Sequence, residues 1–89
     1  MSKLDHWSAE LAIDEHDGET HAEARLVMKE DHQLSGSGTA RRNPADPDVT
    51  EIGEEIAVAR ALSDLAHKLL AAAATEIEAV THERARLHL

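Results

Sequence analysis

The sequence predicts a small α+β domain in which a three-stranded antiparallel sheet is followed by a long helix. Two observations lead to this prediction. Apolar residues alternate with polar ones as far as about residue 41, and after residue 48 they recur every three or four residues. With 89 residues, the chain has room for a single domain, residues 1–89. A domain of this size buries only roughly 60–65% of its unfolded surface, which favours dimerisation.

Three stretches in the N-terminal half have the period of two that is typical of half-buried strands. The apolar face of the first two consists of Trp7, Ala9, Leu11, Ile13, Ala22, Ala24, Leu26 and Met28. Asp17-Gly18 between them predicts a hairpin turn, and a second polar turn leads to the third strand, residues 33–41. Glycines at 36 and 38 of that strand indicate that a bulky neighbour, either Trp7 or the helix, packs close to the backbone.

A loop with two prolines, residues 41–48, separates the sheet from the helix, because proline is excluded from the interior of both. Asp48 is predicted as the helix N-cap, with Glu51 as its capping-box partner. Thr75–Glu78 repeats that pattern, so the helix either breaks or kinks near Ala74 and continues as a short second helix, or runs unbroken for about 30 residues. An unbroken helix, roughly 45 Å long, would overhang so small a sheet, which favours the break.

The tail, Thr81 to Leu89, returns to a period of two, with Ala85, Leu87 and Leu89 on its apolar side. These three residues are the candidates for contacts that the tail would make in a dimer. An ordered, extended tail would add to a sheet edge of its own chain or of a partner, and exchange between two copies would give a two-fold dimer. A disordered end is the alternative. The predicted core is Trp7, Leu11, Ile13, Leu26, Met28, Ile52, Ile56, Leu62, Leu65, Leu69 and Ile77.

Composition disfavours several functional classes. Eighteen acidic residues against nine basic ones give a net charge of −9, which opposes non-specific nucleic-acid binding. A single aromatic residue removes the stacking platforms of single-strand binders. The absence of cysteine removes disulfides and thiolate chemistry and fits a reducing compartment. With no apolar run of about 20 residues, we expect a cytoplasmic protein without membrane contact.

One motif suggests a docking site. Arg41 and Arg42 are the only adjacent basic pair, and they lead into Asn43-Pro44-Ala45-Asp46. A loop made rigid by proline at the junction of sheet and helix would present them to a phosphate or a carboxylate. The alternative is a solvated strand end whose arginines offset nearby acidic residues. The partner-docking candidates are Arg41, Arg42, Asn43 and Asp46.

No motif predicts chemistry. His16 and His21 flank a turn with carboxylates, residue types that bind zinc or nickel, but their spacing matches no metal motif. Gly36-Ser37-Gly38 fits neither a nucleophile elbow nor a dinucleotide fingerprint. The acidic residues after position 50 suit the positive end of a helix dipole. We therefore expect no enzyme, no cofactor, no metal and no catalytic residue.

The chain resembles a family of small actinobacterial proteins of unknown function, over about residues 7–87. The matching segments are Ile13–Gly18, Ala40–Asp46, Glu51–Glu55, Val58–Leu65 and Ile77–His82. The resemblance implies a fold similar to double-stranded-RNA-binding domains and ribosome hibernation-promoting factors, a homodimer, and for some members induction in hypoxic dormancy. It implies no activity and no functional residue.

Two hypotheses of function follow. The first is a non-enzymatic stress or dormancy protein that docks to the ribosome as hibernation factors do. Direct RNA contact would then require one basic face, made of Arg25, Arg41, Arg42, Arg60 and Lys68. The alternative is a dimeric, acidic protein–protein interaction module that binds basic proteins and makes no nucleic-acid contact.

Overall fold

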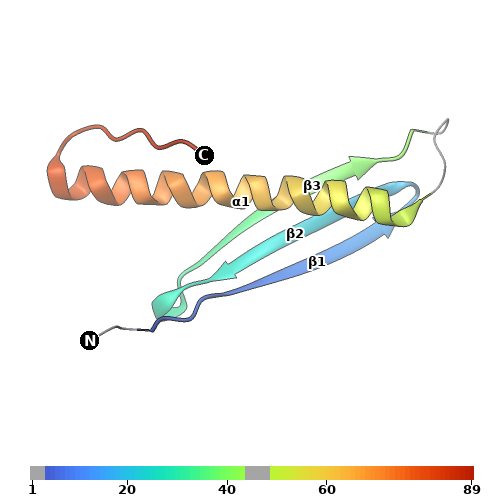
Figure 1. The fold of residues 1–89 in the computed structure, drawn as a ribbon, viewed down its shortest axis with the longest axis horizontal. Coiled ribbons are helices and arrows are strands. Elements are labelled where there is room, and N and C mark those ends of the chain that lie inside the picture. The colour runs from blue at the N-terminus through green and yellow to red at the C-terminus, as the bar shows by residue number, and fades with distance from the viewer. Residues whose placement is uncertain (1–3, 44–48) are drawn as a thin grey trace.

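A computed structural model describes residues 4–43 and 49–89 (Figure 1). The elements are β1 (Ser8–His16), β2 (Glu19–Val27), a short 3-10 turn (Lys29–Asp31), β3 (Gln33–Arg41) and α1 (Thr50–Thr81). The strands form one antiparallel sheet in the order β1-β2-β3, and α1 lies across one of its faces. The predicted meander followed by a helix is confirmed.

A two-residue turn joins β1 to β2. Asp17 and Gly18 both have positive φ, 49° and 76°, as a type I′ turn requires. The turn sets the register, in which Leu11 lies opposite Ala24 and Ile13 opposite Ala22. The odd-numbered residues of β1 and the even-numbered residues of β2 and β3 therefore face α1.

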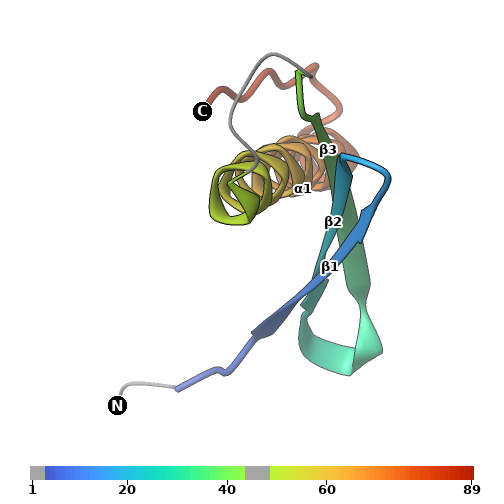
Figure 2. The same cartoon turned by 90° about the vertical axis from the view of Figure 1, so that its right-hand side faces the viewer.

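The helix covers only part of the sheet. It packs on β3 and β2 and barely touches β1, so the α1-facing side of β1 is left uncovered (Figure 2). The core between the two layers is made almost entirely of small side chains. It consists of Ala22, Ala24, Ala40, Ala57, Ala61 and Leu65.

Two glycines in β3 allow this close approach. A Cβ atom at Gly36 would lie 2.8 Å from Leu65 Cα, and one at Gly38 would lie 2.7 Å from Arg60 Cβ, with backbone atoms of α1 closer still. The bulky neighbour that the glycines predicted is therefore the helix. Trp7, the other candidate, is 51% exposed.

The predicted break in the helix is wrong. α1 runs without interruption from Thr50 to Thr81, and its C-terminal part extends past the end of the sheet (Figure 1). Residues 71–74 are alanines, the best helix formers. The Thr75 hydroxyl donates to the Ala71 carbonyl oxygen at 3.0 Å, one turn back, instead of capping a new helix.

The predicted N-cap, Asp48, lies outside the described residues. Helix α1 begins at Thr50, and Val49 before it makes no side-chain capping bond. The packing of α1 on the sheet, with its alanine face against β2 and β3, supplies the stability that a cap would otherwise contribute.

Most of the predicted core is exposed to solvent. Only Leu65 is buried, while Leu26, Met28 and Leu69 are partly buried. The remaining seven are between 40% and 55% exposed, namely Trp7, Leu11, Ile13, Ile52, Ile56, Leu62 and Ile77. The reason is that α1 lays its alanines on the sheet, so that its larger apolar residues project to the sides. The spacing of apolar residues identified the apolar stripe of the helix, but it did not identify which face of the helix packs on the sheet.

Three side chains of α1, four residues apart, close the outer edge of β3. The bonds are Arg60 Nη1 to Thr39 O at 2.7 Å, Ser37 N to Asp64 Oδ2 at 2.9 Å, and Lys68 Nζ to Ser35 O at 2.8 Å. Four residues of a helix and two residues of a strand span similar distances. Each of the three side chains of α1 therefore reaches the next outward-facing residue of β3. These side chains occupy three of the outward backbone groups of β3 and so hinder the pairing of another strand at this edge.

The Asp64 contact makes folding stability depend on pH. The Ser37 N–H, and after it Lys68, holds the pKa of Asp64 below its usual 3.8. Because the folded pKa is the lower one, this stabilisation is complete above the unfolded pKa and is lost as the pH falls through the folded value. We expect urea denaturation between about pH 2 and pH 6 to show a smaller loss of stability in acid for Asp64→Asn than for wild type. Glu76→Gln, which removes an exposed carboxylate from the same helix, is the control, and equal pH profiles for Asp64→Asn and wild type would contradict the prediction.

Candidate docking site

Arg41 lies at the end of β3 on the sheet face opposite α1. Its Nη2 is 2.8 Å from Glu19 Oε2 on β2, and its side chain is 81% exposed. This bond, together with the negative charge of Glu19, raises the pKa of the Arg41 guanidinium. Arg41 is therefore a permanent cation that already has an anionic partner within the chain.

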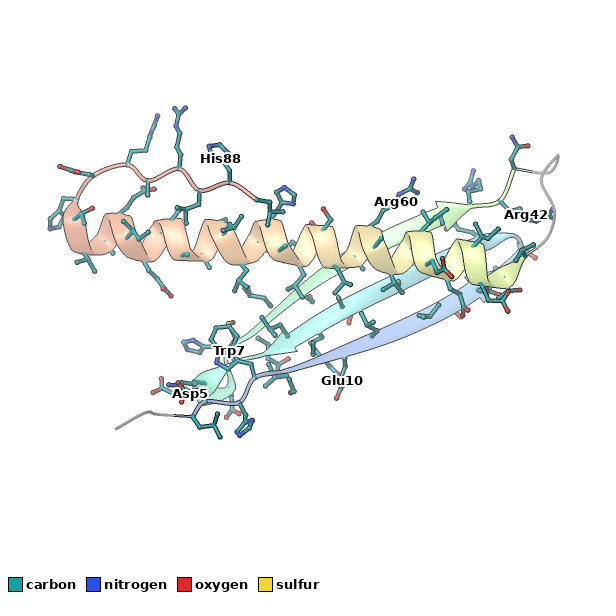
Figure 3. The ribbon with its side chains drawn as sticks, viewed as in Figure 1. Asp5, Trp7, Glu10, Arg42, Arg60 and His88 are labelled. Atoms are coloured by element: carbon teal, nitrogen blue, oxygen red, sulfur yellow. The ribbon has the colours of Figure 1, made fainter. Side chains whose placement is uncertain are left out.

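Arg42 and Asn43 follow at the same corner of the molecule. The Arg42 N–H donates to the Gly18 carbonyl oxygen at 2.9 Å, which ties the end of β3 to the turn between β1 and β2. Figure 3 shows Arg42 beside the first turns of α1. Three of the four predicted docking residues thus lie together, and the fourth, Asp46, is outside the described residues.

An open hollow of about 520 Å³ lies at this corner, between the β1–β2 turn, the end of β3 and the start of α1. We call it the corner hollow. Its polar lining includes Asp17, Glu19, Arg41, Arg42 and Asn43, and its apolar lining includes Val49, Ile52 and Ile56. Charged groups of both signs beside exposed aliphatic side chains suit a protein segment that carries apolar and charged residues together.

The aliphatic lining of the corner hollow was missed in the sequence. Ile52 and Ile56 were predicted to be core residues because they lie on the apolar stripe of the helix. In the structure they are 55% and 40% exposed, and Val49 is 42% exposed. No local signal distinguishes them from core residues, because their exposure depends on how α1 is rotated about its axis.

The basic residues do not gather on one face of the described structure. Arg25 and Arg41 lie on the sheet face opposite α1, whereas Arg60 and Lys68 lie along the edge of β3. Several are paired: Arg25 with Glu10 at 2.9 Å, Lys29 with Asp5 at 2.7 Å, and Lys68 with Asp64 at 3.2 Å. This arrangement leaves little positive potential for phosphate.

The histidines lie apart from any ligand set. His16 contacts Asp17 at 3.1 Å, and His21 Nδ1 lies 3.3 Å from Thr39 Oγ1. Over residues 4–43 and 49–89, no three His, Asp or Glu side chains come together in a way that would hold a metal ion. No helix in this part of the chain has the length and apolarity needed to cross a membrane.

The fold places this chain in a class of small acidic α+β domains. In this class, a three-stranded meander packs under one long helix, and here the core is largely alanine. The chain belongs to the Rv2632c-like family, whose model matches residues 5–86. An uncharacterized protein of Mycobacterium tuberculosis strain CDC 1551 is 55% identical over 84 residues, which cover 94% of this chain and 88% of the relative. Uncharacterized protein Rv2632c of strain H37Rv is 50% identical over 74 residues, covering 83% and 78%.

A solved structure shows the same fold. The crystal structure of Rv2632c matches with a TM-score of 0.82 at 45% identity, over 92% of this chain and 96% of the other. Membership in a family of uncharacterized proteins, expected from the motifs, is confirmed. The likeness to double-stranded-RNA-binding domains and hibernation factors, and the link to dormancy, stay predictions.

Proposed function

We propose that this protein is a non-enzymatic interaction module that docks a protein partner at the corner hollow. The observation that carries the proposal is the exposure of Val49, Ile52 and Ile56 next to Arg41 and Arg42. Aliphatic side chains of this size are usually buried, and clustered exposure of them is typical of interaction sites. Burial by a partner would remove this apolar surface from water.

The charge of the chain favours a basic partner. A net charge of −9 attracts basic proteins at long range and repels phosphate. The pairing of Arg41 with Glu19 also weakens its pull on an RNA backbone. The partner of the corner hollow is therefore a protein surface with basic and apolar residues, and not a nucleic acid.

Ribosome docking during stress or dormancy is the specific form of this proposal that the resemblance to hibernation factors supports. Ribosomal proteins are basic, so an acidic module can dock there without touching RNA. Such docking requires the aliphatic lining of the corner hollow more than it requires the arginines.

Co-sedimentation with ribosomes, at salt concentrations between about 50 and 400 mM, tests this proposal. We expect Ile52→Gln combined with Ile56→Gln to weaken binding about thirtyfold, because each side chain contributes on the order of 1 kcal/mol when buried. Glutamine keeps the helix propensity high. The control is Ile77→Gln, which changes an isoleucine of α1 that is 41% exposed, close to the 40% of Ile56, but lies outside the corner hollow.

The arginines provide the opposing test. Arg41→Ala with Arg42→Ala should change ribosome binding less than the isoleucine pair does. A loss of binding in the arginine variant alone, with a steep dependence on salt, would show phosphate contact and contradict the proposal. If wild type does not pellet at low salt, the ribosome is not the partner, and capture by basic proteins becomes the next measurement.

A further inference from the structure

Helix α1 leaves one strand of the sheet without a second layer. The backbone of α1 lies against Gly36 and Gly38 of β3, and the helix also packs on β2, but it barely touches β1. Leu11 and Ile13 of β1 face the helix side of the sheet, yet they are 48% and 43% exposed. An apolar strand face therefore lies open beside the helix (Figure 2).

The flank of α1 above β1 continues this apolar surface. Arg60 and Lys68 mark the opposite flank, because they bond to the outer edge of β3. A residue two positions away along a helix lies about 200° around it, so the flank toward β1 carries Leu62 and, one turn earlier, Val58. Leu62 is 43% exposed, and Val58 is partly buried against the alanine core.

Trp7 extends this surface at the start of β1. The alternation of the strand places it on the same side as Leu11 and Ile13, and Figure 3 shows its side chain on the side toward α1. We call this surface the β1 shelf, with Trp7, Leu11 and Ile13 as its floor and Val58 and Leu62 as its wall. Four of these five side chains are more than 40% exposed, and clustered exposure of this kind is typical of an interaction site.

The dimensions of the β1 shelf suit a second helix. Neighbouring strands lie about 4.8 Å apart, so β1 lies about 9.6 Å from β3, the strand on which the backbone of α1 rests. The axes of two packed helices lie about 8–10 Å apart. A helix over β1 would therefore pack on the sheet and against the flank of α1 at the same time.

The charges around the β1 shelf specify a basic helix. Glu15 is the next residue of β1 on this face, and Glu54 lies one turn before Val58 on the same flank of α1. β1 carries no lysine or arginine, and neither does the row of α1 at positions 54, 58, 62, 66 and 70. Opposite charges across an interface steer association and fix the register of the two partners. Basic residues beside an apolar stripe would therefore complement the shelf.

We propose that the β1 shelf binds an amphipathic helix of another protein. The helix has aliphatic residues at spacings of three and four toward the shelf, and lysine or arginine beside Glu15 and Glu54. About 12 residues of it, roughly 18 Å, match the length of the flank from Glu54 to Ala66. Binding would remove the apolar floor and wall of the shelf from water.

A second copy of this chain does not supply such a helix. α1 is the one long helix of the described residues, and it carries six acidic residues and two basic ones, a net charge of −4. Docked on the β1 shelf of another copy, it would bring like charges together, which opposes association. The helix that fits the shelf is therefore that of a different protein.

The β1 shelf and the corner hollow can be tested separately. Ile52 and Ile56 of the corner hollow belong to the same row of α1 as Arg60, on the flank away from β1. The two sites share only Glu15. Binding at the shelf therefore does not require the corner hollow, and the loss of one site leaves the other intact.

The fluorescence of Trp7 reports whether the β1 shelf is occupied, because Trp7 is the only aromatic residue of the chain. The probe is a synthetic helical peptide with leucines at spacings of three and four and lysines elsewhere. We expect its titration to move the Trp7 emission to shorter wavelength. A twin peptide with glutamate in place of lysine should bind at least about tenfold more weakly. An unchanged emission, or equal binding of the two peptides, would overturn the proposal.

Two substitutions in the β1 shelf test its residues. Ile13→Thr combined with Leu62→Gln should raise the Kd of the lysine peptide about thirtyfold, because both side chains lose apolar surface that the peptide covers. Threonine suits a strand and glutamine suits a helix, so the circular dichroism spectrum should be unchanged. Ile52→Gln, on the other flank of α1, is the control and should keep the Kd within about twofold.

Two outcomes of these titrations would overturn the assignment. One is a Kd for the variant with Ile13→Thr and Leu62→Gln that equals the wild-type Kd. The other is a shift of the Trp7 emission that appears with rising protein concentration in the absence of peptide, because it would assign the β1 shelf to a second copy.

Discussion

A Gly38→Val chain is expected to lose about 3 kcal/mol or more of its free energy of unfolding. A domain of this size has only roughly 5–10 kcal/mol in total. A Cβ atom at position 38 would meet backbone atoms of Ala57 and Ala61, and it would come within 2.7 Å of Arg60 Cβ. Backbone cannot rotate away as a side chain does, so α1 would have to lift off the sheet and expose the alanine core.

Ser37→Val is the matched control for this substitution. Ser37 precedes Gly38 in β3, but its side chain lies on the exposed face opposite α1. Valine is favourable on a strand, so we expect a change within about 0.5 kcal/mol. Urea denaturation followed by circular dichroism measures both variants. A Gly38→Val chain as stable as wild type would show that the two layers are not in contact at this position.

The second large effect is expected for Leu65→Ala, which should cost about 3 kcal/mol. Leu65 is 6% exposed and is the one large side chain in the buried core of the described residues. The buried residues around it are alanines, Gly36 of β3 lies against its backbone, and the larger side chains packed on this core, Leu26, Leu34 and Val58, lie at its margin, so little of the space that Leu65 leaves can be refilled. The loss of buried apolar surface therefore adds to the cost of a cavity.

Leu62→Ala provides the comparison within the same helix. Leu62 was also predicted to be in the core, but it is 43% exposed, and its truncation should cost less than about 1 kcal/mol. Both variants can be compared by thermal and urea unfolding at one protein concentration. Equal losses at the two positions would mean that Leu62 is buried in the folded protein in solution, contrary to the structure.

The alanine core affects both the stability of this domain and its tendency to bind another chain. Small side chains let the layers approach closely, but each one removes little apolar surface from water. Large apolar residues remain on β1, at the start of α1 and in the tail, where another chain can cover them. Burial of these residues by a partner would then raise the apparent stability of this domain with the partner's concentration.

The order and type of the elements could be predicted from local sequence. Alternation along residues 8–16 and 19–27, with Asp17-Gly18 between them, specifies a hairpin because a two-residue turn with positive φ leaves one register. The change of period after residue 48 predicts the helix. The place of Arg41, Arg42 and Asn43 at one corner also follows, because these residues are neighbours in the chain.

The core, the corner hollow and the two sheet edges were decided by tertiary packing. The helix has a large-residue stripe that includes Ile52 and Leu62, and a small-residue stripe with Ala57 and Ala61. Periodicity ranks the first stripe as the buried one. The structure buries the second, because Gly36 and Gly38 admit a helix backbone and not a row of bulky side chains. That choice rotates α1, exposes the isoleucines, closes the edge of β3 and leaves β1 uncovered. It depends on the fit between two surfaces far apart in the chain, and no local pattern carries that information.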